Sequence, residues 1–253
     1  MIYLKNNADI AIMCDNGKIL SGIFKKLKEI IKAGISTKNI DTIVENIIYS
    51  QSAVPSFKGY RGFPAAACVS VNAEVVHGIP GPRILKEGDI VGVDIGVFKN
   101  GFHVDAARTF PVGTVSAEAG RLIDVARESF FEGSKQAVIG NRVTDISAAI
   151  QRYVESAGFG VIREMLGHGI GRSMHEKPDV PNYGPPGKGP KLRAGMVLAV
   201  EPMISQGDFR LVTQPDGWTT VTKDGKLSAH YENTLAVTYE GPLILTLDNG
   251  DTF

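Results

Sequence analysis

The sequence has few cysteines, no excess of charge of either sign and no long run of apolar residues. Its two cysteines, Cys14 and Cys68, are too few for a disulfide framework and too far apart for a zinc knuckle, so we expect reduced thiols. The 27 basic and 27 acidic residues cancel, which argues against direct nucleic-acid binding. The longest unbroken apolar runs have five residues, against the roughly 20 that a membrane helix needs, so no membrane span is expected.

The first residues also lack a basic leader followed by an apolar stretch, so we expect neither a secretory signal nor a transit peptide, and hence a cytoplasmic location. Glycine, by contrast, is abundant, with 29 of 253 residues against a usual level of about 7%. Many of these glycines flank histidines or acids, which indicates tight backbone near a site. With 43% hydrophobic residues, the chain can bury a sizeable core.

Hydrophobic spacing predicts two helices followed by strands, and then the same order again. We expect helices at 7–33, with a kink at Gly17, and at 36–51, 117–138 and 145–157. The expected strands are 66–71, 75–79, 89–98, 102–112, 161–166, 196–205, 218–223 and 226–238. The doubling predicts two pseudo-equivalent halves within a single domain, residues 1–253.

Two acids interrupt neighbouring apolar strands. Asp94 lies in 90–97 and Asp105 in the return strand, where an unpaired buried carboxylate would cost several kcal/mol. A two-residue turn at Asn100-Gly101 would make the two acids diagonal neighbours on one face, roughly 7 to 8 Å apart. Either acid alone is readily explained as solvated or paired with a basic residue, but the two together favour a cation. His103, on the same strand face, fits a supporting or packing role better than direct ligation.

Three more side chains extend this set. His168 lies between glycines at a strand end, and Glu201 and Glu232 each lie in an apolar strand context. Taken singly, each is more often structural. Together the five make four carboxylates and one imidazole, too negative for one divalent ion but balanced by two. A bridged pair of ions can generate hydroxide near neutral pH, so hydrolysis is the leading chemistry.

In these contexts the chain resembles the type I methionine aminopeptidases of the creatinase/aminopeptidase family, over nearly its whole length. The resemblance is carried by 72–80 with His77, 93–96, Asp105, 167–171, His175-Glu176, Glu201-Pro202 and 231–234. It implies the α+β pita-bread fold, in which two pseudo-equivalent helix-helix-strand halves share a curved, largely antiparallel sheet with helices on its outer face.

The resemblance also implies a ligand set for two divalent ions. Asp94 would chelate one ion, Asp105 and Glu232 would bridge both, and His168 and Glu201 would complete the other. A bridging water or hydroxide would attack the first peptide bond. Oxygen-rich sites with one imidazole accept Co, Mn, Fe, Zn or Ni, so the metal is left open.

Further roles follow from the same resemblance. Glu201 would shuttle the proton, His175 would hydrogen-bond the carbonyl oxygen, and His77 would contact the scissile amide. Substrates would be peptides and nascent chains with N-terminal methionine, with transient ribosome contact. The methionine subsite would be formed by Tyr60, Phe63, Cys68 and Trp218, with Phe57 and Met174 nearby.

The chain departs from many relatives beside the last ligand, where it carries His230 and Asn233, and at Met174, where an aromatic residue is common.

Two alternatives stay open. An Xaa-Pro aminopeptidase or prolidase has similar ligands but usually a long N-terminal domain, for which the 75 or so residues before His77 leave no room. A non-catalytic pita-bread binding module would generally have lost ligands. The spacing from His175 to Glu201 is too short for the helical insertion of type II enzymes.

Overall fold

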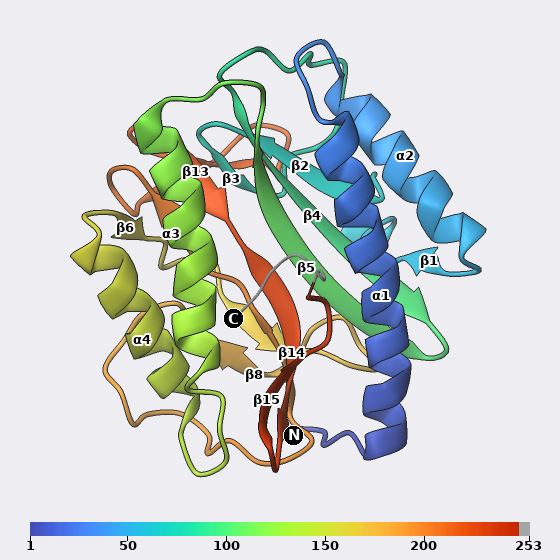
Figure 1. The fold of residues 1–253 in the computed structure, drawn as a ribbon, viewed down its shortest axis with the longest axis vertical. Coiled ribbons are helices and arrows are strands. Elements are labelled where there is room, and N and C mark those ends of the chain that lie inside the picture. The colour runs from blue at the N-terminus through green and yellow to red at the C-terminus, as the bar shows by residue number, and fades with distance from the viewer. Residues whose placement is uncertain (248–253) are drawn as a thin grey trace.

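The computed structural model describes residues 1–247, whose four helices lie against one side of a twisted antiparallel sheet (Figure 1). The helices are α1 (Asn7–Ile30), α2 (Thr37–Ser50), α3 (Ala117–Ser134) and α4 (Val143–Ser156), with a short 3-10 helix η1 (Tyr60–Gly62). The strands are β1 (Val54–Pro55), β2 (Ala67–Val71), β3 (Glu74–Val76), β4 (Ile90–Lys99), β5 (Phe102–Pro111), β6 (Gly160–Val161), β7 (Gly167–Gly169), β8 (Glu176–Val180), β9 (Val197–Val200), β10 (Met203–Ser205), β11 (Leu211–Thr213), β12 (Thr220–Thr222), β13 (Ser228–His230), β14 (Glu232–Thr238) and β15 (Gly241–Ile244). The expected α+β class is confirmed.

One large sheet connects the two halves of the chain. Its order is β1-β4-β5-β14-β9-β7-β8, with β2 beside β4 and β15 beside β14, and every pairing is antiparallel. Strand β5 of the first half therefore pairs with β14 of the second. Helices α1 and α2 lie over the first half, and α3 and α4 over the second (Figure 1). The doubling predicted from the order of elements is present.

Each helix pair buries its own apolar face against the sheet. Under α1 and α2, Leu20, Ile23 and Ile40 pack with the odd-numbered residues of β4, such as Val93. A second core lies under α3 and α4, where Leu122 and Ile146 are among the fully buried residues. The even-numbered residues of β4 consequently point to the opposite face, because side chains alternate along a strand.

Side-chain caps explain where the first two helices begin. The Asn6 side chain accepts from the Asp9 amide, and the Asp9 carboxylate accepts from the Asn6 amide, which makes a capping box at the start of α1. At the start of α2 the Ser36 hydroxyl accepts from the Asn39 amide, a cap formed by a single side-chain hydrogen bond. No kink appears at Gly17, because α1 is one continuous helix. This glycine instead permits close packing, since a Cβ there would lie 1.8 Å from the Leu245 carbonyl oxygen.

Two expected strands are each broken in the middle. The segment 196–205 divides into β9 and β10 at Glu201-Pro202, because proline has no amide hydrogen to donate to a ladder. The segment 226–238 divides into β13 and β14 at Tyr231, whose amide donates to the Pro202 carbonyl rather than to the large sheet. At the first break the chain leaves the large sheet, and β10 joins the three-stranded sheet β13-β10-β6. At the second break it leaves that sheet, and β14 joins the large one.

Several other elements are shorter in the structure than the sequence predicts. The strand at 161–166 ends at Val161, because its partner β10 has only three residues. The helix at 117–138 ends at Ser134, after which the Ala137 amide bonds back three residues to the Ser134 carbonyl. The strand at 75–79 stops before His77, whose φ of 59° turns the chain, and 218–223 is reduced to β12. Among residues 1–247, none of the helices is long and apolar enough to cross a membrane.

Candidate metal centre

The hairpin of β4 and β5 brings its two acids together as expected. Lys99 pairs with Phe102, so the loop is the two-residue turn Asn100-Gly101, with φ values of 52° and 83°. In this register Asp105 lies opposite Gly96, one diagonal step from Asp94. Both carboxylates face away from α1, since their strand neighbours carry the apolar face.

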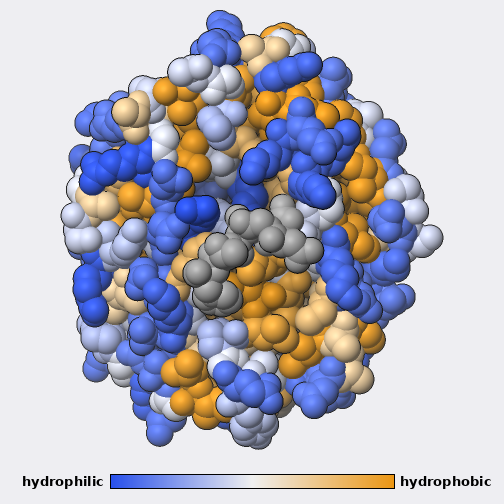
Figure 2. All heavy atoms as spheres, viewed as in Figure 1, coloured by the Kyte–Doolittle hydropathy of each residue, from blue (hydrophilic) through white to orange (hydrophobic). Residues whose placement is uncertain are grey.

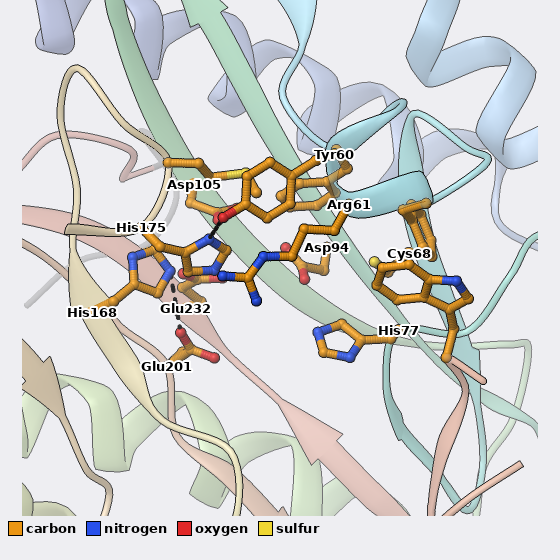
Figure 3. Close-up of a pocket in the computed structure, with 14 residues that line it drawn as sticks. Tyr60, Arg61, Cys68, His77, Asp94, Asp105, His168, His175, Glu201 and Glu232 are labelled. Atoms are coloured by element: carbon orange, nitrogen blue, oxygen red, sulfur yellow. Dashed lines mark hydrogen bonds and ion pairs between the residues drawn. The ribbon is translucent and has the colours of Figure 1, made fainter.

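The strand order supplies the other three predicted ligands. His168 lies in β7, Glu201 follows β9, and Glu232 begins β14, and these strands are neighbours in the large sheet. One ligand atom from each of Asp105, His168 and Glu232 lies within 4.8 Å of the others, and His168 Nε2 is 3.7 Å from Glu201 Oε1. All five predicted ligands line one cavity of about 170 Å³ (Figure 3).

Burial and mutual repulsion disfavour the charged form of the four carboxyl groups in the absence of a cation. Burial raises the pKa of Asp94, Glu201 and Glu232 well above the usual value, and raises the pKa of Asp105 to about 7, because desolvation disfavours a charged carboxylate. Neighbouring acids add to the shift, with Asp105 and Glu201 acting on Asp94. Three buried oxygens, Asp94 Oδ1, Asp105 Oδ1 and Glu232 Oε1, have no hydrogen-bond partner. Four converging carboxylates with unpaired oxygens suit divalent ions.

His168 is oriented as a ligand. Its Nδ1 lies 2.9 Å from the Gly169 carbonyl oxygen, which can only accept, so Nδ1 carries the hydrogen. The lone pair of Nε2 is then directed toward Glu201. Burial lowers the pKa of the ring, which keeps it neutral and able to bind a metal.

Two more histidines line the cavity. His175 Nδ1 lies 2.8 Å from the Tyr60 hydroxyl, and its ring centroid is 4.2 Å from that of His168. Burial, followed by the charges of His168 and Arg61, lowers the pKa of His175 to about 4. Burial also lowers the pKa of His77. Both rings are therefore neutral at pH 7.

An apolar wall adjoins the ligands. Phe63 meets Trp218 edge to face at 5.2 Å between ring centroids, and His77 meets Trp218 in the same way at 6.3 Å. The wall brings together all four side chains predicted for the methionine subsite and the two named beside them, namely Tyr60, Phe63, Cys68, Trp218, Phe57 and Met174. The cavity thus joins a cluster of acids to an apolar recess.

Sequence reasoning missed one residue of the cavity wall. Arg61 lines it beside His175, from the short 3-10 helix η1 between β1 and β2. The available signal was a basic residue held between two glycines, Gly59 and Gly62, in an aromatic-rich loop.

The two unusual neighbours of Glu232 have different surroundings. The Asn233 side chain points to the opposite face, where its Oδ1 accepts from Arg108 Nη2 at 2.8 Å and from the Thr246 hydroxyl at 2.9 Å. His230 Nε2 lies 3.9 Å from Glu232 Oε2. Burial, followed by the charges of His77 and Arg108, lowers the pKa of His230 to about 3, so the ring is uncharged and forms no ion pair with Glu232.

A buried ion pair anchors the segment that carries His175. Lys5 Nζ lies 2.6 Å from Glu176 Oε2, with both side chains 5% exposed, and Glu176 Oε1 accepts from the Ser173 amide. We expect Lys5→Met to lower the free energy of unfolding by about 3 to 5 kcal/mol, because it leaves Glu176 buried without its partner. Urea denaturation measures this change.

The matched control is Lys18→Met. Lys18 also pairs with an acid, Asp15, but the two side chains are 76% and 71% exposed, so little change in stability is expected. Equal, small effects of the two substitutions would show that the Lys5 pair does not hold the segment in place.

Comparisons with known proteins agree with this geometry. Residues 11–239 match metallopeptidase family M24. The chain is 58% identical to a methionine aminopeptidase from Clostridium perfringens over 98% of this chain and 99% of that protein. It is 51% identical to methionine aminopeptidase 1 from Bacillus subtilis over 97% and 99% of the two chains.

Solved structures bear out the expected fold. A methionine aminopeptidase from Thermotoga maritima superposes with a TM-score of 0.96 and 44% identity, covering 98% of this chain and 100% of that one. A prolidase from Pyrococcus furiosus superposes with a TM-score of 0.80 over 97% of this chain and 66% of its own length. At 20% identity the second match concerns the fold alone. The pita-bread fold and the resemblance read from the sequence motifs are confirmed.

Proposed function

The chain belongs to metallopeptidase family M24, and from this premise we infer that it is a metal-dependent aminopeptidase that removes N-terminal methionine from peptides. One observation carries this inference. Four carboxylates and a neutral imidazole from separate strands converge, with unpaired buried oxygens, directly beside an apolar recess (Figure 3). Such a site combines cation binding with recognition of an apolar side chain.

Family membership implies use of a divalent metal, and we propose two ions held by Asp94, Asp105, His168, Glu201 and Glu232. The support is charge balance, since four carboxylates carry four negative charges and two divalent ions cancel them. When bound, the ions supply a nucleophile from water at neutral pH and stabilise negative charge on the substrate oxygen. The donor set admits Co, Mn, Fe, Zn or Ni.

Three side chains are proposed to act on the substrate and on protons. Glu201 has a pKa raised by burial, which suits a group that takes up a proton and returns it to the leaving amine. Neutral His175, with Nδ1 engaged by the Tyr60 hydroxyl, can donate from Nε2 to the carbonyl oxygen as it gains negative charge. His77 faces the same cavity and is proposed to contact the scissile amide.

The apolar recess is proposed to hold the methionine side chain. Phe63 and Trp218 supply aromatic faces, and Cys68 and Met174 supply polarisable sulfur beside them. An unbranched thioether packs well against such groups, whereas a branched side chain of similar volume meets the ring walls. Tyr60 would close the recess on the side of His175.

The test is a comparison of three peptides with metal-loaded protein. Met-Ala-Ser is expected to release free methionine with a kcat/KM at least about 10- to 100-fold above that of Leu-Ala-Ser or Ala-Pro-Ala, because one misfitting group in an apolar subsite costs about 1 to 3 kcal/mol. Released amino acids are measured by chromatography, with Mn, Co and Zn tried separately. Faster cleavage of Ala-Pro-Ala would favour a prolidase. Cleavage of none of them with any metal would favour a non-catalytic binding module.

The proposal also covers the domain organisation, the natural substrates and the cellular location. Residues 1–253 are proposed to act as one catalytic domain, which the pairing of β5 with β14 across the two halves supports. Nascent chains are the proposed natural substrates, and that role would place the protein in the cytoplasm. Transient ribosome contact and the absence of nucleic-acid binding stay predictions from the sequence.

A further inference from the structure

Arg61 occupies a backbone conformation that side chains other than glycine rarely adopt. Its φ and ψ are 49° and 22°, between Gly59 and Gly62, whose φ values are 84° and 91°. Backbone hydrogen bonds hold the loop on both sides, from the Gly59 amide to the Phe63 carbonyl at 2.8 Å and from the Phe63 amide to the Tyr60 carbonyl at 2.9 Å. A strained residue held this firmly beside a reaction centre suggests a function for its side chain.

The Arg61 side chain extends across the cavity toward His175 (Figure 3). It is exposed and lies over the neighbouring Tyr60 ring, at 5.5 Å from the guanidinium carbon to the ring centroid. Within residues 1–247 no carboxylate forms an ion pair with it, although four carboxylates line the same cavity.

The net charge of the site suggests that this guanidinium has a role in binding the substrate. Two divalent ions would cancel the charges of the four carboxylates, and the remaining lining group with a permanent charge is the Arg61 guanidinium. Arg61 is then the uncompensated charge among the cavity-lining residues. Among the residues that line the cavity, Arg61 and His175 are the exposed ones, so the cavity opens beside them. A peptide with methionine in the apolar recess and its first amide near His175 would therefore leave the cavity past Arg61.

We propose that Arg61 is a specificity-determining residue that favours substrates with an acidic side chain shortly after the scissile bond. This rests on the proposed aminopeptidase function and adds to it the class of leaving peptide. A guanidinium can donate two parallel hydrogen bonds to one carboxylate. Because the backbone of Arg61 is already fixed by the loop, less conformational entropy is lost when its side chain binds. A role limited to packing on Tyr60 would be indifferent to the charge of the substrate.

The experiment compares metal-loaded wild type and variants on Met-Ala-Asp-Ser, Met-Ala-Ser-Ser and Met-Ala-Lys-Ser. For wild type, kcat/KM for the Asp peptide is expected to exceed that for the Ser peptide about threefold to fivefold, as for one partly exposed ion pair. Arg61→Gln should bring this ratio to about 1, and Arg61→Lys should keep part of it. In about 1 M NaCl the wild-type ratio should also fall toward 1, because salt screens exposed charges.

A second readout does not depend on turnover. Trp218 is the single tryptophan of the chain and lines the same cavity, so its fluorescence reports binding. Analogues of the three peptides with a reduced CH2–NH bond in place of the first amide should show the same order of dissociation constants. Lys25→Gln, which removes one positive charge from an exposed position on α1, is the matched control and should keep the wild-type ratio.

The outcomes separate the two levels of the proposal. An unchanged Asp-to-Ser ratio in Arg61→Gln, or an equal loss on all three peptides, overturns the role of Arg61 while leaving the aminopeptidase function intact. If wild type cuts no peptide with any metal, the proposed function fails and the substrate preference fails with it. A loss of the preference in Lys25→Gln as well would assign it to overall charge rather than to Arg61.

Discussion

Asp105→Asn is expected to lower kcat on Met-Ala-Ser by at least about 1,000-fold while leaving the fold intact. Asp105 is buried, lies near both His168 and Glu232, and has an oxygen without a hydrogen-bond partner. Asparagine has nearly the same shape but no charge, so the site would lose a negative ligand shared by the cluster. A 1,000-fold loss corresponds to about 4 kcal/mol of transition-state stabilisation, the scale of metal-ion catalysis.

Two measurements distinguish this effect from misfolding. The circular dichroism spectrum of metal-free Asp105→Asn should match that of metal-free wild type. Its thermal midpoint should be equal or higher, because the substitution removes one of four mutually repelling buried acids. Asp15→Asn is the matched control, since that side chain is 71% exposed and remote from the ligands, and it should retain turnover. If Asp105→Asn kept wild-type turnover, the proposal that Asp105 is a metal ligand would be wrong.

Chelation is expected to abolish turnover and to change how stability depends on pH. In metal-free protein, burial raises the pKa of Asp105 from 3.8 to about 7, so between these pH values the folded state holds a proton that the unfolded state has released. The free energy of unfolding must then fall as pH rises through this window, and the stabilising contribution is complete only below about pH 4. The raised pKa values of Asp94, Glu201 and Glu232 act in the same direction.

Adding Mn²⁺ or Co²⁺ should reverse this loss. Metal binds the deprotonated carboxylates, so at pH 8 and 100 times the dissociation constant it should stabilise the fold by about 2.7 kcal/mol per ion. Thermal melts at pH 5 and pH 8, with and without EDTA, measure the change, and calorimetry with a chelated sample counts the ions. A metal-free protein that is more stable at pH 8 than at pH 5, or turnover that survives EDTA, would contradict the proposed ligand set.

Much of the site could be predicted because its signals are local. An acid inside an apolar strand needs a partner wherever the strand goes, and the Asn100-Gly101 turn determines which residues of β4 and β5 lie opposite each other. The same holds for the capped starts of α1 and α2, which depend on side chains a few residues apart. These features require no knowledge of distant contacts.

The boundaries of the second half were less predictable. Apolar runs at 196–205 and 226–238 look like long strands, yet each is divided where the chain moves between the large sheet and a small one. Where such a division falls depends on the strand it pairs with. The pattern of a single segment contains no information about its partner's length.

By itself, then, the sequence determined which acids and which histidine would be candidates for the cavity, the β4–β5 register, the α+β class and the two-half organisation, since turn chemistry and hydrophobic period act over a few residues. Tertiary structure alone decided that Lys5 would be buried against Glu176, 171 residues away, and that Arg61 would reach across the cavity toward His175. Both depend on how distant segments pack. A charged side chain has the same local signature whether its surroundings become solvent, an ion pair or the wall of a site.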